Sequence, residues 1–225
     1  MSDNLEEIAT LRGLIAELGG LAEVAIASAV DALIRHDEDL ALAVVEGDAK
    51  LDAIEAEVDR AAMRMIALRS PSSDELRDII AALKISGVVE RIGDYAKNIA
   101  KRVVDVQVAA KIGPLTLIPA MAEIAQNMVR DALNAYAARD PHLAIEVVKR
   151  DEKLDNYYDS LFRNLVSHMM ENPKTISSAA QLLFVARSLE RIGDHATNVC
   201  EMVYFAATGL YYSERDRPGG KEPII

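Results

Sequence analysis

Glu90-Arg-Ile-Gly-Asp94 recurs unchanged, one hundred positions later, as Glu190-Arg-Ile-Gly-Asp194, and Asn98 and Asn198 follow the two copies at the same spacing. Side chains four residues apart lie on one side of an α-helix, so each copy aligns two carboxylates and an amide. All three are oxygen donors. The stretch therefore predicts a duplicated, all-α protein with two matching acidic sites, and metal binding is the chemistry that such sites favour.

The repeat extends beyond this motif. Residues 21–25 match residues 121–125 at the same offset, whereas residues 48–52 match residues 151–155 at an offset of 103. The offset returns to one hundred at Glu90. Fixed blocks separated by such a drift indicate loops of different length between helices. We therefore expect two tandem three-helix bundles related by internal duplication.

The halves meet near Gly113-Pro114, where proline and glycine stop a helix. The predicted units are residues 1–113 and residues 114–212. Residues 213–225 contain Arg-Pro-Gly-Gly-Lys-Glu-Pro and offer little to bury, so we expect a disordered tail.

Capping residues mark the predicted helix ends. Asp37 and Asp140, the latter followed by proline, begin the second helix of each half. Ser72 and Glu75 form a capping box that opens the third helix of the first half. Asn172-Pro173 stops the matching second helix of the second half.

Apolar residues at alternating spacings of three and four form a seam along the last helix of each half, which is typical of a helical bundle. The first seam consists of Ala82, Ile85, Val89, Ile92, Ala96, Ile99 and Val103. The second consists of Leu182, Val185, Leu189, Ile192, Ala196, Val199 and Val203. The acidic row falls at other heptad positions, so we expect it on the surface.

Composition narrows the functional class. The chain has 225 residues, of which 51% are apolar and none is tryptophan. Its net charge of −11 disfavours nucleic acid as a binding partner and suits cations or basic proteins. The single Cys200 excludes an intrachain disulfide and suits a reducing compartment. No signal peptide is recognisable, and Glu23 and Asp31 interrupt the most apolar stretch. We expect a cytoplasmic protein without membrane insertion.

Each half places two carboxylate pairs on neighbouring helices. The pairs are Asp48/Asp52 with Glu90/Asp94, and Asp151/Asp155 with Glu190/Asp194. Clustered carboxylates repel one another and retain protons unless cations neutralise them. Oxygen-only ligands select hard ions such as ferric iron, manganese, magnesium or calcium, and four carboxylates can hold a cluster of ions.

A lone Glu-x-x-x-Asp is usually a solvated helix face, but identical duplication together with a second duplicated pair favours metal binding. Salt bridges to Arg91 and Arg191 are an equally weighted structural alternative. Gly93 and Gly193 cost about 1 kcal/mol each of helix propensity relative to alanine, and we interpret them as sites of close helix packing. His195 is replaced by tyrosine in the first copy, which argues against a shared ligand role.

At these residues the chain closely resembles the PhoU family of bacterial phosphate-signalling regulators. The doubled Glu-Arg-Ile-Gly-Asp block, the paired Asp-x-x-x-Asp motifs and residues 176–194 carry the resemblance, which covers residues 11–212. It implies two three-helix bundles, each with a multinuclear cluster of iron, or of manganese, magnesium or zinc. Carried over position by position, the ligands are the eight carboxylates above, with Asn98 and Asn198 added.

The resemblance also implies a role. Members restrain the phosphate-starvation sensor histidine kinase when phosphate is plentiful, through contact with that kinase and with the ATPase of the phosphate ABC transporter. It further implies a homodimer. The leading hypothesis is therefore a non-enzymatic adaptor. A metal-dependent phosphohydrolase and a metal-storage protein are the alternatives, although no nucleophile–base pair, Glu-x-x-His or nucleotide-binding loop is present.

Overall fold

The structure, a computed structural model, describes residues 2–106 and 117–212, and these ranges contain helices and no strand. The first half holds α1 (Ser2–Arg35), α2 (Glu38–Arg69), α3 (Ser73–Ala100) and the 3₁₀ helix η1 (Val104–Val106). The second half holds α4 (Leu117–Ala138), α5 (Pro141–Val148), α6 (Asp151–Glu171), η4 (Pro173–Thr175) and α7 (Ile176–Thr208). The all-α prediction is confirmed. The predicted boundary at 113/114 and the tail from 213 lie outside the described residues.

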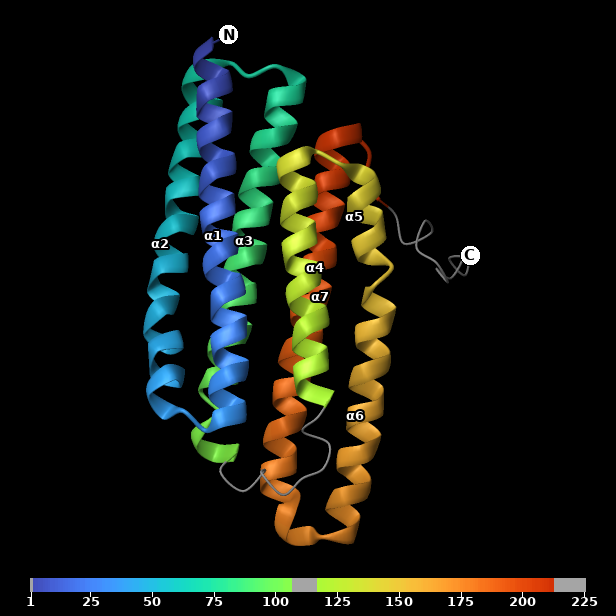
Figure 1. The fold of residues 1–225 in the computed structure, drawn as a ribbon. Helices are drawn as coiled ribbons and strands as arrows, with labels where there is room; N and C mark the ends of the chain where they lie inside the picture. Colours follow the sequence, from blue (N-terminus) through green and yellow to red (C-terminus); the bar gives the residue numbers. More distant parts are fainter. Residues whose placement is uncertain (1, 107–116, 213–225) are drawn as a thin grey trace.

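The two bundles lie side by side, with α1, α3, α4 and α7 in the middle, α2 on one flank, and α5 and α6 on the other (Figure 1). In each half the last helix contacts the outer helix and also the last helix of the other half. The motif helices α3 and α7 are therefore central to the molecule.

The predicted caps explain where the helices begin. The Asp37 carboxylate accepts a hydrogen bond from the Leu40 N–H at 2.9 Å, and that of Asp140 accepts one from the Leu143 N–H at 3.1 Å. The Ser72–Glu75 capping box is present with both of its hydrogen bonds. These bonds satisfy N–H groups that the first turn of a helix leaves unpaired.

The turn before each second helix shows the duplication in three dimensions. His36 and Arg139, which correspond at the offset of 103, both adopt left-handed backbone conformations, with φ of 55° and 51°. In each turn the next residue, Asp37 or Asp140, donates its N–H to a carbonyl five residues back at 2.9 Å. Two copies of one helix–turn–helix unit therefore retain the same uncommon backbone geometry.

In the second half the predicted middle helix is interrupted. There the helix is divided into α5 and α6 at Lys149 and Arg150. The N–H of Arg150 donates to the carbonyl of Val147, three residues back, which tightens the turn and interrupts the α-helical pattern. Asp151 consequently begins α6, where the positive end of the helix dipole favours a carboxylate.

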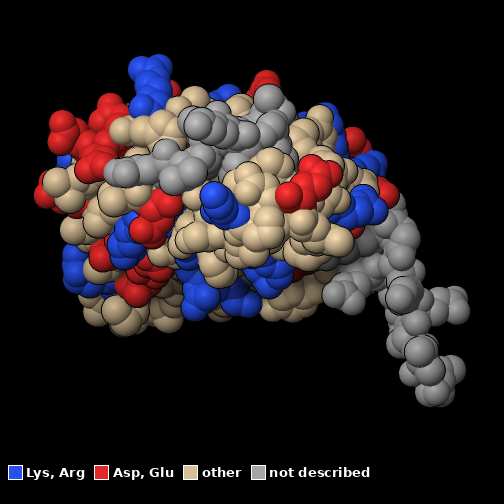
Figure 2. Space-filling model, turned by 90° about the horizontal axis from the view of Figure 1, so that it is seen from below, with Lys and Arg blue, Asp and Glu red and all other residues tan. Residues whose placement is uncertain are grey.

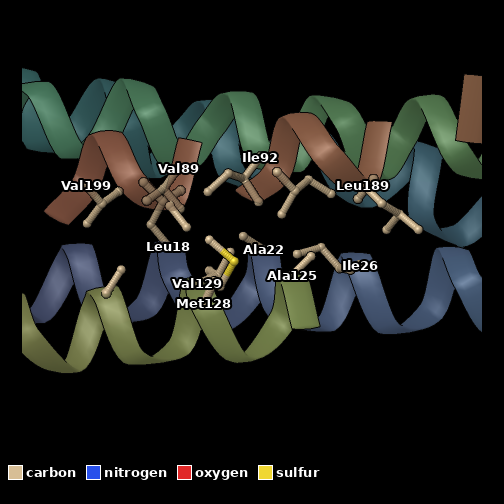
Figure 3. Packing of buried hydrophobic residues seen from close by; sticks show 14 of the residues in the cluster. Leu18, Ala22, Ile26, Val89, Ile92, Ala125, Met128, Val129, Leu189 and Val199 are labelled. Atoms are coloured by element: carbon tan, nitrogen blue, oxygen red, sulfur yellow. The ribbon is translucent and has the colours of Figure 1, made fainter. Parts of the chain in front are cut away.

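Both predicted seams are buried, and none of their fourteen residues is more than 1% exposed. Figure 3 shows Val89 and Ile92 of α3 and Leu189 of α7 packed with Leu18 of α1 and Met128 of α4. One continuous core therefore spans both halves. This shared core holds the two motif helices against each other.

Helix α1 owes its hydropathy to that core. Among the described residues, Glu6–Arg35 has the length and mean hydropathy (1.6) of a membrane-spanning helix. Ile15, Leu18 and Ile26 are buried where α1 packs against α2, α3 and α4, whereas Val24 and Ile34 are exposed. A helix buried between two bundles needs an apolar surface of this kind.

Candidate metal centre

In the first half, α2 and α3 bring Asp48 and Asp94 to one cation. The ammonium of Lys97 lies 2.5 Å from Asp94 and also forms an ion pair with Asp48 on the neighbouring helix. The Asp48 side chain is only 11% exposed. The two carboxylates, widely separated in sequence, thus share a single positive charge. Their hydrogen bonds with the ammonium raise the pKa of Lys97. Sequence reasoning missed Lys97.

A further carboxylate, Glu55, joins this acidic row. Burial and then the nearby Asp59 and Asp52 raise the pKa of Glu55. Burial is the main cause of the raised pKa of Glu90, and the charges of four nearby carboxylates, including Glu55, raise it further. Sequence reasoning also missed Glu55, although the 4-3-4 spacing of acidic residues along α2 places it on the same face as Asp48 and Asp52.

In the second half, Glu190 is buried at 9% exposure, which corrects the prediction of a surface position. Its Oε1 accepts a hydrogen bond from Arg187 at 2.7 Å, while its buried Oε2 lacks a hydrogen-bond partner among the described atoms. Burial and then the Asp194 carboxylate raise the pKa of Glu190. The heptad position of Glu190 predicted exposure because heptad positions describe α7 alone. In the structure α6 packs against α7, and its Asp155 lies near Glu190.

The remaining members of the second row are more open. Arg191 pairs with Asp194 at 2.9 Å, so the predicted arginine salt bridge is present in this half. Asp155 is exposed, yet partial desolvation followed by the Asp194 carboxylate raises its pKa. Asp155 on α6 and Asp194 on α7 are therefore close enough to repel each other.

The two motif glycines allow α3 and α7 to approach their outer helices closely. A Cβ on Gly93 would lie 2.6 Å from Cδ2 of Leu51, and one on Gly193 would lie 2.4 Å from Cδ2 of Leu154. The same hypothetical Cβ on Gly193 would lie 3.2 Å from Oδ1 of Asp151. Leu51 and Leu154 are equivalent in the repeat, so the same packing supports the acidic row in both halves and fits the interpretation of close packing.

The outermost candidates face solvent. Asn98, Asn198 and Asp52 are exposed, and Asp48 and Asp151 are partly buried. Acidic side chains are also dense on the side of the first bundle, at the left of Figure 2. Each row therefore runs from a partly buried centre to an open surface.

Two observations test whether these rows suit a metal. In the first row an ammonium already occupies the space between Asp48 and Asp94, which shows that they accept a shared cation. In the second row the buried Oε2 of Glu190 lacks a hydrogen bond, and the Nε of the Arg191 guanidinium lies 3.8 Å from it. Both donor sets consist of the oxygen ligands that hard ions prefer. In residues 2–106 and 117–212, no three Asp, Glu, His or Cys side chains converge as a preformed metal site.

The family profile of the PhoU domain matches this chain twice, at residues 15–103 and 118–203. The chain belongs to the PhoU family. The two matches coincide with the two bundles, and each PhoU domain contains one acidic row. The predicted duplication and the resemblance are therefore both confirmed.

Named relatives cover most of the chain. It is 52% identical over 212 residues to the phosphate-specific transport system accessory protein PhoU homolog of Zymomonas mobilis, covering 94% of this chain and 90% of the relative. The Caulobacter vibrioides homolog of the same name is 46% identical over 205 residues, covering 91% and 89%. The crystal structure of PhoU from Pseudomonas aeruginosa matches with a TM-score of 0.87 at 35% identity, covering 91% of this chain and 99% of that one.

Proposed function

We propose that this protein is a cytoplasmic, non-enzymatic adaptor that represses the phosphate-starvation response and limits phosphate uptake when phosphate is plentiful. Its partners are the sensor histidine kinase of the phosphate two-component system and the ATPase of the phosphate ABC transporter, and it acts as a homodimer. The observation that carries this proposal is the double PhoU-domain match, together with relatives named as accessory proteins of phosphate-specific transport.

The charge of the molecule supports a role in binding. A net charge of −11 with acidic side chains on the first bundle favours basic partner surfaces or metal ions over nucleic acid. Side chains of Phe162 and Phe184 are 44% and 53% exposed, and Arg102 lies 4.4 Å from the Phe184 ring centroid. Exposed aromatic and arginine side chains are enriched in protein interfaces.

The proposal includes metal ions, iron first, bound by the carboxylates of the two rows. Burial and then repulsion from neighbouring carboxylates raise the pKa values of Glu90 and Glu190, and such ions, when bound, supply positive charge that offsets both effects. The carboxylates of each row come from two helices, α2 and α3 in the first half and α6 and α7 in the second. A bound ion would therefore strengthen each bundle at the face that carries its acidic row.

The test is a phosphatase reporter controlled by the phosphate-starvation response, in a deletion strain grown with ample phosphate. The proposal expects the reporter to be on in the deletion strain and off when the gene is restored, with the empty vector as control. A reporter that stays off in the deletion strain contradicts the adaptor role. Turnover of phosphate esters by the purified protein with iron, manganese or magnesium would instead support the phosphohydrolase.

A further inference from the structure

The two acidic rows differ at one pair of equivalent positions. Position 97 is lysine in the first half, and position 197, one hundred residues later, is threonine. The ammonium of Lys97 connects two helices by pairing with Asp48 of α2 and Asp94 of α3. Its side chain is only 21% exposed. This lysine is therefore part of the row and does not extend into solvent.

Threonine supplies no charge at the equivalent place. The hydroxyl of Thr197 donates to the carbonyl of Asp194, on its own helix, at 2.7 Å, and the residue is 3% exposed. The arginines near this row, Arg187 and Arg191, pair with carboxylates of their own helix and are more than 40% exposed. Their exposed side chains can turn away from the row more easily than the enclosed Lys97.

The position of the ammonium has a consequence for metal binding. An ion shared by Asp48 and Asp94 requires the space between their carboxylates, which the ammonium of Lys97 occupies. Two cations cannot share that space, because like charges a few ångströms apart repel strongly where water is partly excluded. A metal ion must therefore displace the lysine, and the energy of two charge-assisted hydrogen bonds opposes the exchange.

We propose that Lys97 is an internal competitor for the metal ion at the first row, so that the two rows bind metal with different affinities. The inference rests on the metal-binding part of the proposed function. In the absence of metal, the lysine offsets part of the row's negative charge and holds α2 to α3. The second row, with Thr197 in its place, has no equivalent competitor at this position.

The experiment measures Mn²⁺ binding at the first row alone. The full-length parent carries Asp151→Asn and Asp194→Asn, which disable the second row, and free Mn²⁺ is followed by electron paramagnetic resonance during titration. Adding Lys97→Thr should tighten Mn²⁺ binding by about tenfold or more, since the loss of each ~1.4 kcal/mol of competing interaction corresponds to a factor of ten. Lys97→Arg retains a cation and should leave the affinity within about threefold of the parent.

Lys50→Thr is the matched control, because it removes the same charge from an exposed position of α2. It should bind Mn²⁺ as the parent does. Equal affinity of the Lys97→Thr variant and the parent overturns the inference, and so does an equal gain from Lys50→Thr. If the Lys97→Thr variant, with unchanged circular dichroism, binds no Mn²⁺, both the inference and the metal part of the proposed function fail. Intact repression by the wild-type gene in the reporter strain would still support the adaptor role.

Discussion

The rings of Tyr95 and His195 meet edge to face, with 5.3 Å between their centroids and 86° between their planes. The two residues occupy the same position in the two copies of the motif. Contact between equivalent residues places them near the axis that relates the two halves, as in a two-fold symmetric interface. The motif thus has two roles: one side of each helix carries the acidic row, and another side joins the bundles.

Gly193→Ala should lower the free energy of unfolding by about 1–3 kcal/mol, because the new methyl group overpacks against buried Leu154. Urea denaturation measures the change. Gly13→Ala is the control, since Gly13 is exposed on α1 and a Cβ there would contact nothing within 4 Å. That variant should gain up to about 1 kcal/mol from helix propensity. Equal gains in both variants would contradict the packing role of Gly193.

Arg139 joins the two halves while adopting an unfavourable backbone conformation. Its guanidinium donates to the carbonyl of Ala206 at 2.8 Å and pairs with buried Asp78 of α3 at 3.2 Å, at a φ of 51°. Arg139→Ala should therefore destabilise the fold by about 2–4 kcal/mol, since it removes an ion pair with a buried carboxylate and a hydrogen bond to the Ala206 carbonyl. Arg139→Gly should be less damaging by about 1 kcal/mol, because glycine tolerates positive φ.

The equivalent His36 provides the control for this comparison, since it is exposed and shares the left-handed conformation with a φ of 55°. His36→Gly should stabilise the protein by up to about 1 kcal/mol in thermal or urea unfolding. A loss of stability at this position, comparable with that of Arg139→Gly, would show that the turn matters and that the ion pair of Arg139 does not.

Cys200 should resist thiol reagents in the folded protein. Burial raises the pKa of its thiol, and the residue is 1% exposed. Reaction with Ellman's reagent at pH 8 should therefore be slow without denaturant and complete in urea. Because the folded pKa lies above the unfolded value, Cys200 favours the folded state below about pH 8.5, and this contribution is lost as pH rises further. Ser160→Cys, on an exposed turn of α6, should react rapidly without urea.

Asp94→Asn combined with Asp194→Asn should abolish bound metal while the helical content stays nearly the same. The change removes one carboxylate from each row without altering side-chain volume, and Asp94 and Asp194 are both partly exposed. Elemental analysis of purified protein measures the metal, and far-ultraviolet circular dichroism measures the helices. Metal content equal to that of the wild type would disprove the ligand assignment for these residues.

The sequence alone determined the helices and the duplication. Caps at Asp37, Ser72 and Asp140 and both apolar seams depend on spacing within one helix, and the structure confirms them. The repeated motif also identified the acidic residues of each row. These features are local, because side-chain periodicity and capping are set by residues a few positions apart.

Only the tertiary structure decided what lies opposite each acidic row. The burial of Glu190, the addition of Glu55 and the bridge from Lys97 to Asp48 all depend on how an outer helix packs against α3 or α7. A heptad position describes one helix and cannot say which neighbour covers its flanks. Electrostatic energies depend on distance and burial, so the charge balance that distinguishes the two rows emerges only when the helices are packed together.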